Sequence, residues 1–546
     1  MGYHDPVECL ELLNRLHPLN IDETHRLLSE MVPALLRKPP APEQHLAILE
    51  AARPHIALAQ SAMASRYAAH PLPPDSVENE TLRSVVALWQ AMARSYEHVA
   101  RASGAEILPA DQGALLAQRR IHYAGMVPLE YFRAHRSIPR GTWTALHDSF
   151  CAAEALGVAT SRVPDALNDI WKAQSAAEAF VAVLLVDLAN PYGRSERDLG
   201  WVCRWAQRFA PYCELLGAPD GESPQPAAYG LDLGADHGLR PLGVLRPSAA
   251  LRRFDGSKLA GQIKAVLKQF KQGVTPSSLG LGADCPVDAC ARLLLSLYRP
   301  WGLASAGRRF PRRGTQGRAE LTVGWPSIAF HVSGKPFEQP PIYATQRSLR
   351  SDISLLTFGE RVTRAHNPRW NENERLRAAT RLGFRCEHWQ VADHSVSGFR
   401  LYQDPHTHRL EHHQLVGIRP PDGEHFLLAQ LSWLMYRADG VMEAGVQVLS
   451  GLPRVVAVRP FGLSSNLHEA FLEAFLLPPT PALKAGASIV LPAKWFQPQR
   501  VIEVADGAER YQLRLTKPIL RGPDFVQVSY ETLESQASGA KPGTAR

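Results

Sequence analysis

The chain of 546 residues lacks the features by which membrane-spanning and secreted proteins are recognised. Its most continuous apolar run extends only from Ala179 to Val186, which is too short to cross a bilayer. The first residues contain no basic segment followed by an apolar stretch, so they do not resemble a signal peptide. We therefore expect a cytoplasmic protein that does not enter a membrane.

The sequence also lacks the common catalytic motifs. It contains no G-x-S-x-G, no Walker loop, no H-E-x-x-H and no complete G-x-G-x-x-G. No nucleophile is paired with a base in the sequence pattern. We expect no catalytic residues, and hence a protein that is not an enzyme.

Cysteine is scarce: seven residues are scattered along the chain, mostly inside apolar helical patterns. This usage favours buried, reduced thiols. Cys285 and Cys290 lie five positions apart without a second pair, so they support a zinc site only weakly. A histidine cluster at 406–413 is typical of an exposed loop between strands. We therefore expect neither a metal nor a cofactor.

The charge is moderately positive, with a net value of +7, and much of the excess is arginine. Arginine-rich surfaces suit anionic partners such as nucleotides, nucleic acids or acidic lipids. Binding of single-stranded nucleic acid usually needs aromatic pairs at strand spacing, which are missing here. The composition therefore favours a nucleotide over a nucleic acid as the partner.

The pattern along the chain changes from helical to β. From about 7 to 215, apolar residues recur at intervals of three and four, and prolines divide the region into helices, with Asp75 a plausible cap. The predicted class is a multidomain α+β protein: an all-α N-terminal domain, an antiparallel β-barrel and a further C-terminal β unit. The expected domains are a helical domain at 1–216, a mixed α/β connecting region at 227–300, a barrel at 301–460 with an insertion at about 335–380, a β unit at 486–532 and a disordered tail at 533–546.

Short apolar runs separated by turn residues predict the strands of the barrel. The turn signals include Pro421-Asp422-Gly423 and Ala438-Asp439-Gly440. The expected strands are Ala319–Val323, Ile328–Val332, His388–Ala392, Phe399–Tyr402, Gln414–Ile418, Phe426–Tyr436, Val441–Leu449 and Arg454–Val458.

Between two of these runs lies the pattern D-x-S-x-x-G, formed by Asp393, Ser395 and Gly398. Asp and Ser side chains hydrogen-bond nearby backbone or a polar ligand, and glycine allows a turn with positive φ. The pattern alone indicates no more than a β-turn. We expect the two strands to meet there at a tight, polar corner.

Two arginine clusters precede this corner. The first holds two overlapping R-x-x-x-R pairs, Arg308/Arg312 and Arg309/Arg313, and the second consists of Arg377, Arg381 and Arg385. Guanidiniums at this spacing can hold one phosphate from two sides and can stack on purine rings. Either cluster, taken alone, could be an ordinary solvated surface.

Together with Gly445-Val446 on a late strand, these motifs resemble the PilZ domain, a six-stranded barrel that binds cyclic di-GMP. The resemblance covers roughly 305–460, and more specifically it is to long PilZ-containing proteins with a helical N-terminal half. It implies that arginines hold the phosphates and guanine faces, while Asp393 and Ser395 bind a guanine edge. A carboxylate complements the N1–H and N2–H₂ donors of guanine, and Gly398 would let the backbone approach the base.

The resemblance leaves the position of the arginine clamp open. Arg308, Arg309, Arg312 and Arg313 lead into a β run, as the family pattern requires, but they lie farther from Asp393 than in that pattern. The alternative clamp lies immediately before the corner, in a helix-like segment. We favour the first cluster, with the insertion at about 335–380 separating it from the corner.

These inferences predict a receptor for cyclic di-GMP that transmits ligand binding to a protein partner through its helical half. The alternative is a degenerate PilZ fold that serves as a scaffold or chaperone-like interaction protein and binds no nucleotide. A basic barrel that binds RNA ranks last.

Overall fold

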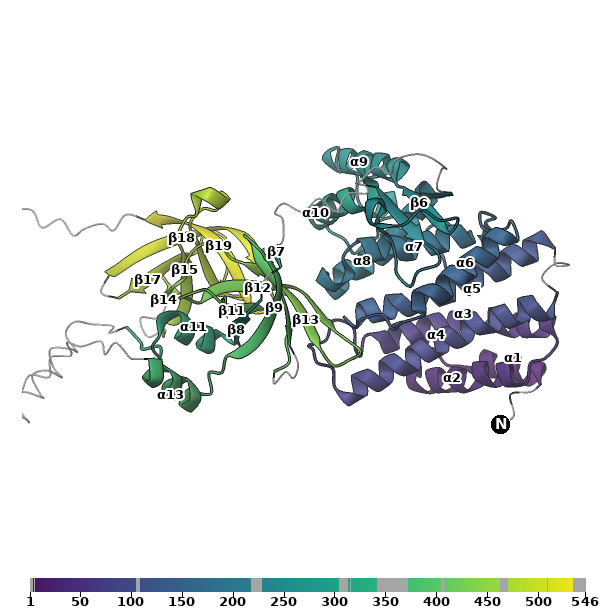
Figure 1. Cartoon of the computed structure of the whole chain (residues 1–546), viewed down its shortest axis with the longest axis horizontal. Helices are drawn as coiled ribbons and strands as arrows, with labels where there is room; N and C mark the ends of the chain where they lie inside the picture. Colours follow the sequence, from purple (N-terminus) through teal and green to yellow (C-terminus); the bar gives the residue numbers. More distant parts are fainter. Residues whose placement is uncertain are drawn as a thin grey trace, which may run out of the picture. The chain divides into compact units, whose positions relative to one another are not determined.

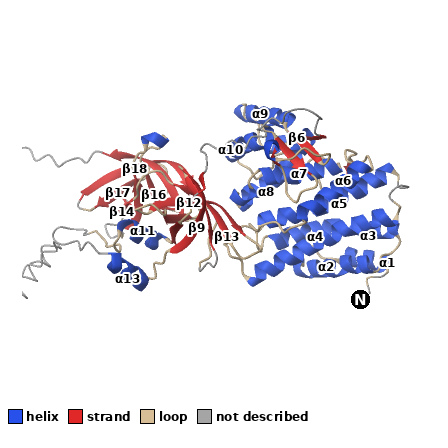
Figure 2. Ribbon diagram, in the orientation of Figure 1, coloured by secondary structure: helices blue, strands red, loops and turns tan. Residues whose placement is uncertain are grey.

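The computed structural model forms two compact units (Figure 1). One consists of Met1–Arg309 and Leu434–Gly440, and the other of Phe310–Trp433 and Val441–Arg546. The first is mainly helical and the second mainly β (Figure 2), which confirms the predicted multidomain α+β class. The structure describes residues 3, 5–104, 109–217, 228–303, 313–314, 316–340, 372–403, 408–461, 470–507 and 509–533.

The N-terminal helices follow the predicted apolar periodicity. At the start of α4, the Asp75 side chain accepts a hydrogen bond of 2.8 Å from the backbone N–H of Glu78. The Glu78 carboxylate in turn accepts one of 2.9 Å from the N–H of Asp75, so the predicted cap is a complete capping box. The helices are α1 (Pro6–Arg15), α2 (Ile21–Arg37), α3 (Pro42–Ala64), α4 (Ser76–Ala102), α5 (Ala110–Arg133), α6 (Thr142–Ala155), α7 (Ala176–Leu188) and α8 (Glu196–Phe209).

A polar network crosses the interior of this helical domain. Asp165 follows a short hairpin strand, β1 (Val163–Pro164), and lies 2.7 Å from Arg53 of α3 and 3.3 Å from Arg119 of α5. All three side chains are at least 95% buried. A buried carboxylate between two buried guanidiniums compensates charges that would otherwise be costly to remove from water.

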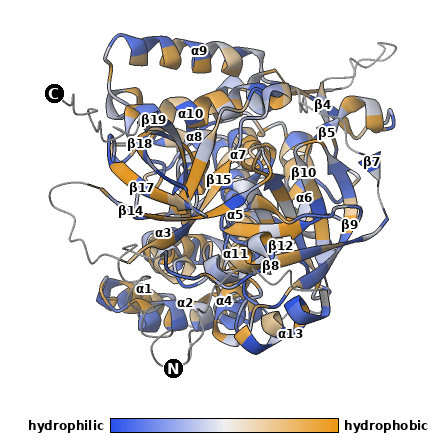
Figure 3. Ribbon diagram, turned by 90° about the vertical axis from the view of Figure 1, so that its left-hand side faces the viewer, coloured by the Kyte–Doolittle hydropathy of each residue, from blue (hydrophilic) through white to orange (hydrophobic). Residues whose placement is uncertain are grey.

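The segment that follows the helical domain shares its hydrophobic core. Phe254 of the small sheet and Ile263 of α9 are buried in the same cluster as Phe180 of α7 and Trp205 of α8. Figure 3 shows alternating hydrophilic and hydrophobic segments along α9, as its amphipathic pattern predicts. The elements of this segment are β3 (Glu214–Gly217), β4 (Tyr229–Asp232), β5 (Arg240–Pro241), β6 (Leu251–Asp255), α9 (Ser257–Lys271) and α10 (Val287–Leu297), with the sheet order β3-β6-β4-β5.

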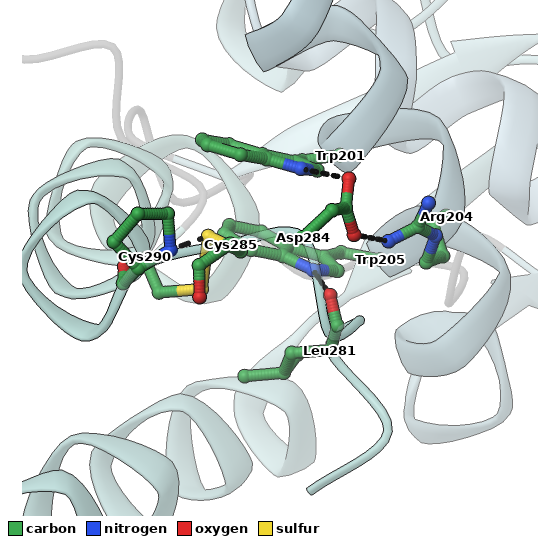
Figure 4. Close-up of a disulfide and its surroundings, with 8 residues drawn as sticks. Trp201, Arg204, Trp205, Leu281, Asp284, Cys285 and Cys290 are labelled. Atoms are coloured by element: carbon green, nitrogen blue, oxygen red, sulfur yellow. Dashed lines mark hydrogen bonds and ion pairs between the residues drawn. A yellow bond between two sulfur atoms is a disulfide. The ribbon is translucent and has the colours of Figure 1, made fainter. Parts of the chain in front are cut away.

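The prediction of reduced thiols is wrong for one pair, because Cys285 and Cys290 form a disulfide (Figure 4). Cys290 lies on the first turns of α10, and the turn before the helix brings Cys285 within a Cα–Cα distance of 6.0 Å. Nearby, Asp284 accepts a hydrogen bond of 2.8 Å from Nε1 of Trp201 and pairs with Arg204 at 2.5 Å. These contacts attach the loop before α10 to α8.

The first β structure of the second unit is a ring of antiparallel strands. The paired order is β10-β13-β12-β11-β8-β9, and β9 also pairs with β10, which closes the ring. The predicted antiparallel barrel is therefore present. Its strands are β8 (Arg318–Val323), β9 (Glu387–Ser395), β10 (Gly398–Gln403), β11 (Leu415–Arg419), β12 (Leu427–Tyr436) and β13 (Met442–Val448), and a short strand, β7 (Arg313–Gly314), adds to β9.

The expectation of a strand at Ile328–Val332 is wrong. These residues belong to helix α11 (Trp325–Ser333), which has Pro326 in its first turn and Gly334, with φ of 73°, at its C-cap. Proline at the first helical positions and glycine after the last favour a helix. A short apolar run cannot distinguish a buried helix from a buried strand by periodicity alone.

The last strands form a second closed barrel, in the order β14-β15-β16-β19-β18-β17. β14 contains Arg454–Val458, which we expected among the strands of the first barrel; instead it pairs with β15 and β17. Residues 534–546, where a disordered tail is expected, lie outside the described residues. The strands are β14 (Arg454–Pro460), β15 (Leu472–Leu477), β16 (Ser488–Pro492), β17 (Val501–Asp506), β18 (Glu509–Arg521) and β19 (Phe525–Leu533).

The turn between β12 and β13 groups with the helical unit. The backbone N–H of Tyr436 donates to the carbonyl of His135 at 2.9 Å, and the N–H of Ser137 donates to the carbonyl of Tyr436 at 3.0 Å. The guanidinium of Arg136 lies over the Tyr436 ring, 5.3 Å from its centroid. This turn therefore has specific backbone partners after α5.

Over the described residues, no helix combines the length and apolar character needed to cross a membrane.

Candidate functional site

The predicted corner is a β-hairpin between β9 and β10. Ser395 pairs with Gly398 across the turn residues Val396 and Ser397, and Asp393 pairs with Arg400. The Ser395 hydroxyl donates a weak hydrogen bond of 3.4 Å to the carbonyl of Gly398. The structure thus places the three motif residues Asp393, Ser395 and Gly398 at one end of the ring.

The reason for glycine at 398 differs from the expected one. Gly398 has no positive φ, so it is not required by left-handed backbone. A Cβ at this position would lie 2.2 Å from the carbonyl oxygen of Val446 on β13. Glycine is needed because two strands approach closely here, and the conformational part of the prediction is wrong.

Arg400 is a candidate site residue that the sequence analysis missed. It lies directly opposite Asp393, and side chains of directly opposed residues project from the same face of an antiparallel pair. Its guanidinium also contacts both carboxylate oxygens of Glu443 on β13, at 3.2 and 3.3 Å. The signal was available in the sequence, because Arg400 follows Gly398 by two residues and a two-residue turn pairs it with Asp393.

One arginine of the first cluster lies beside the corner. In β7, Arg313 pairs with His394 and Gly314 pairs with Asp393. The Arg313 side chain is exposed. By strand alternation it shares a face with His394, and Asp393 lies on the other face. The other members of that cluster, Arg308, Arg309 and Arg312, lie outside the described residues.

The alternative cluster lies at the opposite end of β9. Arg377 and Arg381 are exposed on α13 (Glu372–Leu382), and Arg385 is exposed just before β9 begins at Glu387. From Glu387 to Asp393 the strand extends about 20 Å at ~3.3 Å per residue. The structure therefore does not bring these arginines next to the corner, whereas it brings the backbone of Arg313 there.

The Gly445-Val446 pair of the late strand also has a packing role. β10 and β13 run side by side, with Arg400 opposite Gly445 and Phe399 opposite Val446. A Cβ on Gly445 would lie 1.9 Å from Nε1 of Trp433 on β12. The glycine therefore leaves room for an indole ring over the sheet.

The chemistry of the corner suits recognition of a ligand by hydrogen bonds. It combines the Asp393 carboxylate, the Ser395 hydroxyl and the Arg400 guanidinium on adjoining strands. In the part of the chain that the structure describes, no group of three or more His, Cys, Asp or Glu side chains is arranged to hold a metal. Of the predicted histidine loop, His408 pairs with Glu387 at 2.7 Å, and His406 lies outside the described residues.

The fold and the corner define a multidomain α+β protein with two antiparallel β rings, one of which carries a polar corner. Residues 7–220 match the family model described as "Cyclic-di-GMP receptor FimW, N-terminal domain". Residues 456–533 match the model described as "FimW C-terminal beta-barrel domain". The second match begins within β14, in agreement with the pairing of that strand in the second barrel.

A relative from Pseudomonas aeruginosa, named "Cyclic-di-GMP receptor FimW", is 22% identical to this chain over 443 residues. The alignment covers 75% of this chain and 70% of the relative. Along the sequence, one matched segment precedes and the other follows the strands of the ring that contains Asp393.

Proposed function

We propose that this protein is a receptor for cyclic di-GMP that binds the dinucleotide at the β9–β10 corner. The observation that carries the proposal is the register of β9 and β10, which sets Arg400 opposite Asp393. β7 adds Arg313 to the same end of β9, where it pairs with His394. The matches to the two domains of a family named for cyclic di-GMP binding support the same ligand.

In this proposal the first ring is a PilZ domain, and each residue type has a distinct role. Asp393 and Ser395 bind the donor edge of a guanine, because a carboxylate complements the N1–H and N2–H₂ groups. The arginines at 308, 309, 312 and 313 bind the phosphates and stack on the guanine faces. Arg400 orients the Asp393 carboxylate from the neighbouring strand.

The protein acts as a cytoplasmic receptor and catalyses no reaction. Ligand binding holds the arginine segment against the ring and favours one conformation over another. β13 pairs with β10 and begins directly after the turn Leu434–Gly440, so it offers a covalent route from the corner to the helical unit. A protein partner then reads the change through the helical half.

Calorimetric titration of the full chain with cyclic di-GMP tests the proposal. Asp393→Ala removes the guanine-binding carboxylate, and we expect it to weaken binding by at least about tenfold, which corresponds to ~1.4 kcal/mol. Asp422→Ala, an exposed aspartate in another turn of the ring, is the matched control and should bind like the wild type.

A second pair of variants locates the clamp. The double change Arg309→Ala and Arg313→Ala should abolish binding, whereas Arg377→Ala with Arg381→Ala should leave it unchanged. The reverse result would assign the clamp to α13. If the wild-type protein fails to bind at ligand concentrations on the order of tens of micromolar, the receptor function is refuted and the scaffold alternative stands.

A further inference from the structure

The helical unit contains a pocket of about 590 Å³, and none of the residues at the β9–β10 corner lines it. Its walls come from α8, α9, the loop around Trp171 and the glycine-containing loop 275–283. Ligand pockets in proteins usually measure about 300–1,000 Å³, so this pocket has the size of a site for a mononucleotide-sized molecule.

Two arginines of α8 give the pocket its positive charge. Arg204 is paired with Asp284 at 2.5 Å, and Asp169, the carboxylate that lines the pocket, is paired with Lys172 at 2.8 Å. Arg208 is different: among the described residues its guanidinium has no carboxylate partner, and its buried Nε has no hydrogen-bond partner. The pocket therefore contains one cationic group whose charge is not neutralised.

The residues around Arg208 hold its side chain in place without neutralising its charge. Its guanidinium carbon lies 6.0 Å from the centroid of the Trp171 ring, and the indole Nε1 of Trp171 donates to the Arg208 carbonyl at 3.2 Å. Burial lowers the pKa of Arg208, which is the expected effect of removing an unpaired cation from water. An anion bound in the pocket would offset the free-energy cost of burying this unpaired guanidinium.

The loop opposite α8 is shaped to leave the guanidiniums accessible. Gly280 and Gly282 have φ of 70° and 106°, a backbone that disfavours side chains. A Cβ on Gly282 would lie 2.0 Å from a guanidinium nitrogen of Arg204. Ser277 and Ser278 are exposed at the pocket wall. The Ser278 hydroxyl donates to the carbonyl of Thr275 at 2.8 Å, so the Ser277 hydroxyl is the one of the two that can donate to an anion.

We propose that this pocket binds the phosphate group of a small phosphorylated molecule, with Arg208 as the principal phosphate ligand. Arg208 and Arg204 offer planar guanidiniums, which bind phosphate with two hydrogen bonds each. The Ser277 hydroxyl supplies a further donor, and the Trp171 ring gives the organic part of the ligand an apolar wall. The site lies wholly within the first unit and is separate from the proposed cyclic di-GMP corner.

Calorimetry on the full chain with sodium pyrophosphate and with adenosine monophosphate tests the site. We expect at least one probe to bind below about 1 mM and binding to weaken as salt is added. Arg208→Gln should weaken binding by about tenfold or more, and Arg208→Lys by less, because lysine keeps the charge but loses the bidentate geometry.

Arg197→Gln is the matched control. Arg197 also lies on α8 and stacks on a tryptophan, Trp201, but it does not line the pocket. Binding by this variant should stay within about twofold of wild type, because Arg197 does not line the pocket. Failure of both probes to bind the wild type, or equal loss in Arg197→Gln and Arg208→Gln, would overturn the proposal.

The same variants separate this site from the corner. Arg208→Gln should bind cyclic di-GMP like the wild type, and Asp393→Ala should bind the phosphate probes like the wild type. Loss of cyclic di-GMP binding in Arg208→Gln would make the pocket part of the dinucleotide site and refute a second site.

Discussion

Replacing Gly398 with alanine should loosen the ring at the corner. The new Cβ would lie 2.2 Å from the carbonyl oxygen of Val446, where an ordinary contact is about 1 Å longer. The obstacle is backbone, so relief requires β10 and β13 to separate. Forced overpacking of this kind costs typically about 1–3 kcal/mol.

Hydrogen exchange of the full chain, followed by mass spectrometry of the peptide 442–448, measures the loss of local stability at β13. A loss of 1–3 kcal/mol in opening free energy predicts exchange about 5- to 150-fold faster at β13. Gly314→Ala is the control, because a Cβ there meets nothing within 4 Å. If β13 exchanges equally fast in Gly398→Ala and wild type, the close approach of the strands is not what selects glycine.

Two further predictions concern the stability of the helical domain. Asp165→Asn removes the more buried of two carboxylates that Arg53 and Arg119 share, and leaves Glu50 paired with both. Urea denaturation should therefore show a loss of about 3 kcal/mol, at the lower end of the range for a broken buried pair. The exposed Asp169→Asn should change stability by no more than about 0.5 kcal/mol, and equal effects would contradict the ion-pair argument. Burial lowers the pKa of His45 from 6.5 to about 4, so the folded state disfavours its proton. His45 therefore costs no stability above pH 6.5 and should reduce it by up to about 1.4 kcal/mol per pH unit as the pH falls from 6.5 towards 4. His45→Phe should flatten the stability profile in this window, and an unchanged slope would exclude His45 as its source.

The predicted helices and most predicted strands are present because their signals are local. The period of three and four in α4 and its cap at Asp75 need only neighbouring residues. The corner was predicted for the same reason, since D-x-S-x-x-G lies between two apolar runs that can pair only by turning there.

The failures have different causes, one of them a missed local signal and the others contacts that the sequence pattern does not show. Ile328–Val332 is apolar enough for a strand, and its flanking Pro326 and Gly334 were the missed evidence for a helix. Arg454–Val458 has a strand pattern in either barrel, and only its pairing with β15 and β17 decides which one it joins. The Cys285–Cys290 bond depends on the turn that brings two thiols together before α10.

The sequence by itself determined the division into a helical first half and a mainly β second half, and which polar residues lie at the turn Asp393–Gly398. Those features depend on side-chain periodicity and turn chemistry, which act over a few residues. Only the tertiary structure decided that β7 brings Arg313 beside the corner while α13 places Arg377 and Arg381 at the far end of β9, and that Gly398 faces a backbone carbonyl. Strand pairing and close packing join residues distant along the chain, and no local pattern contains that information.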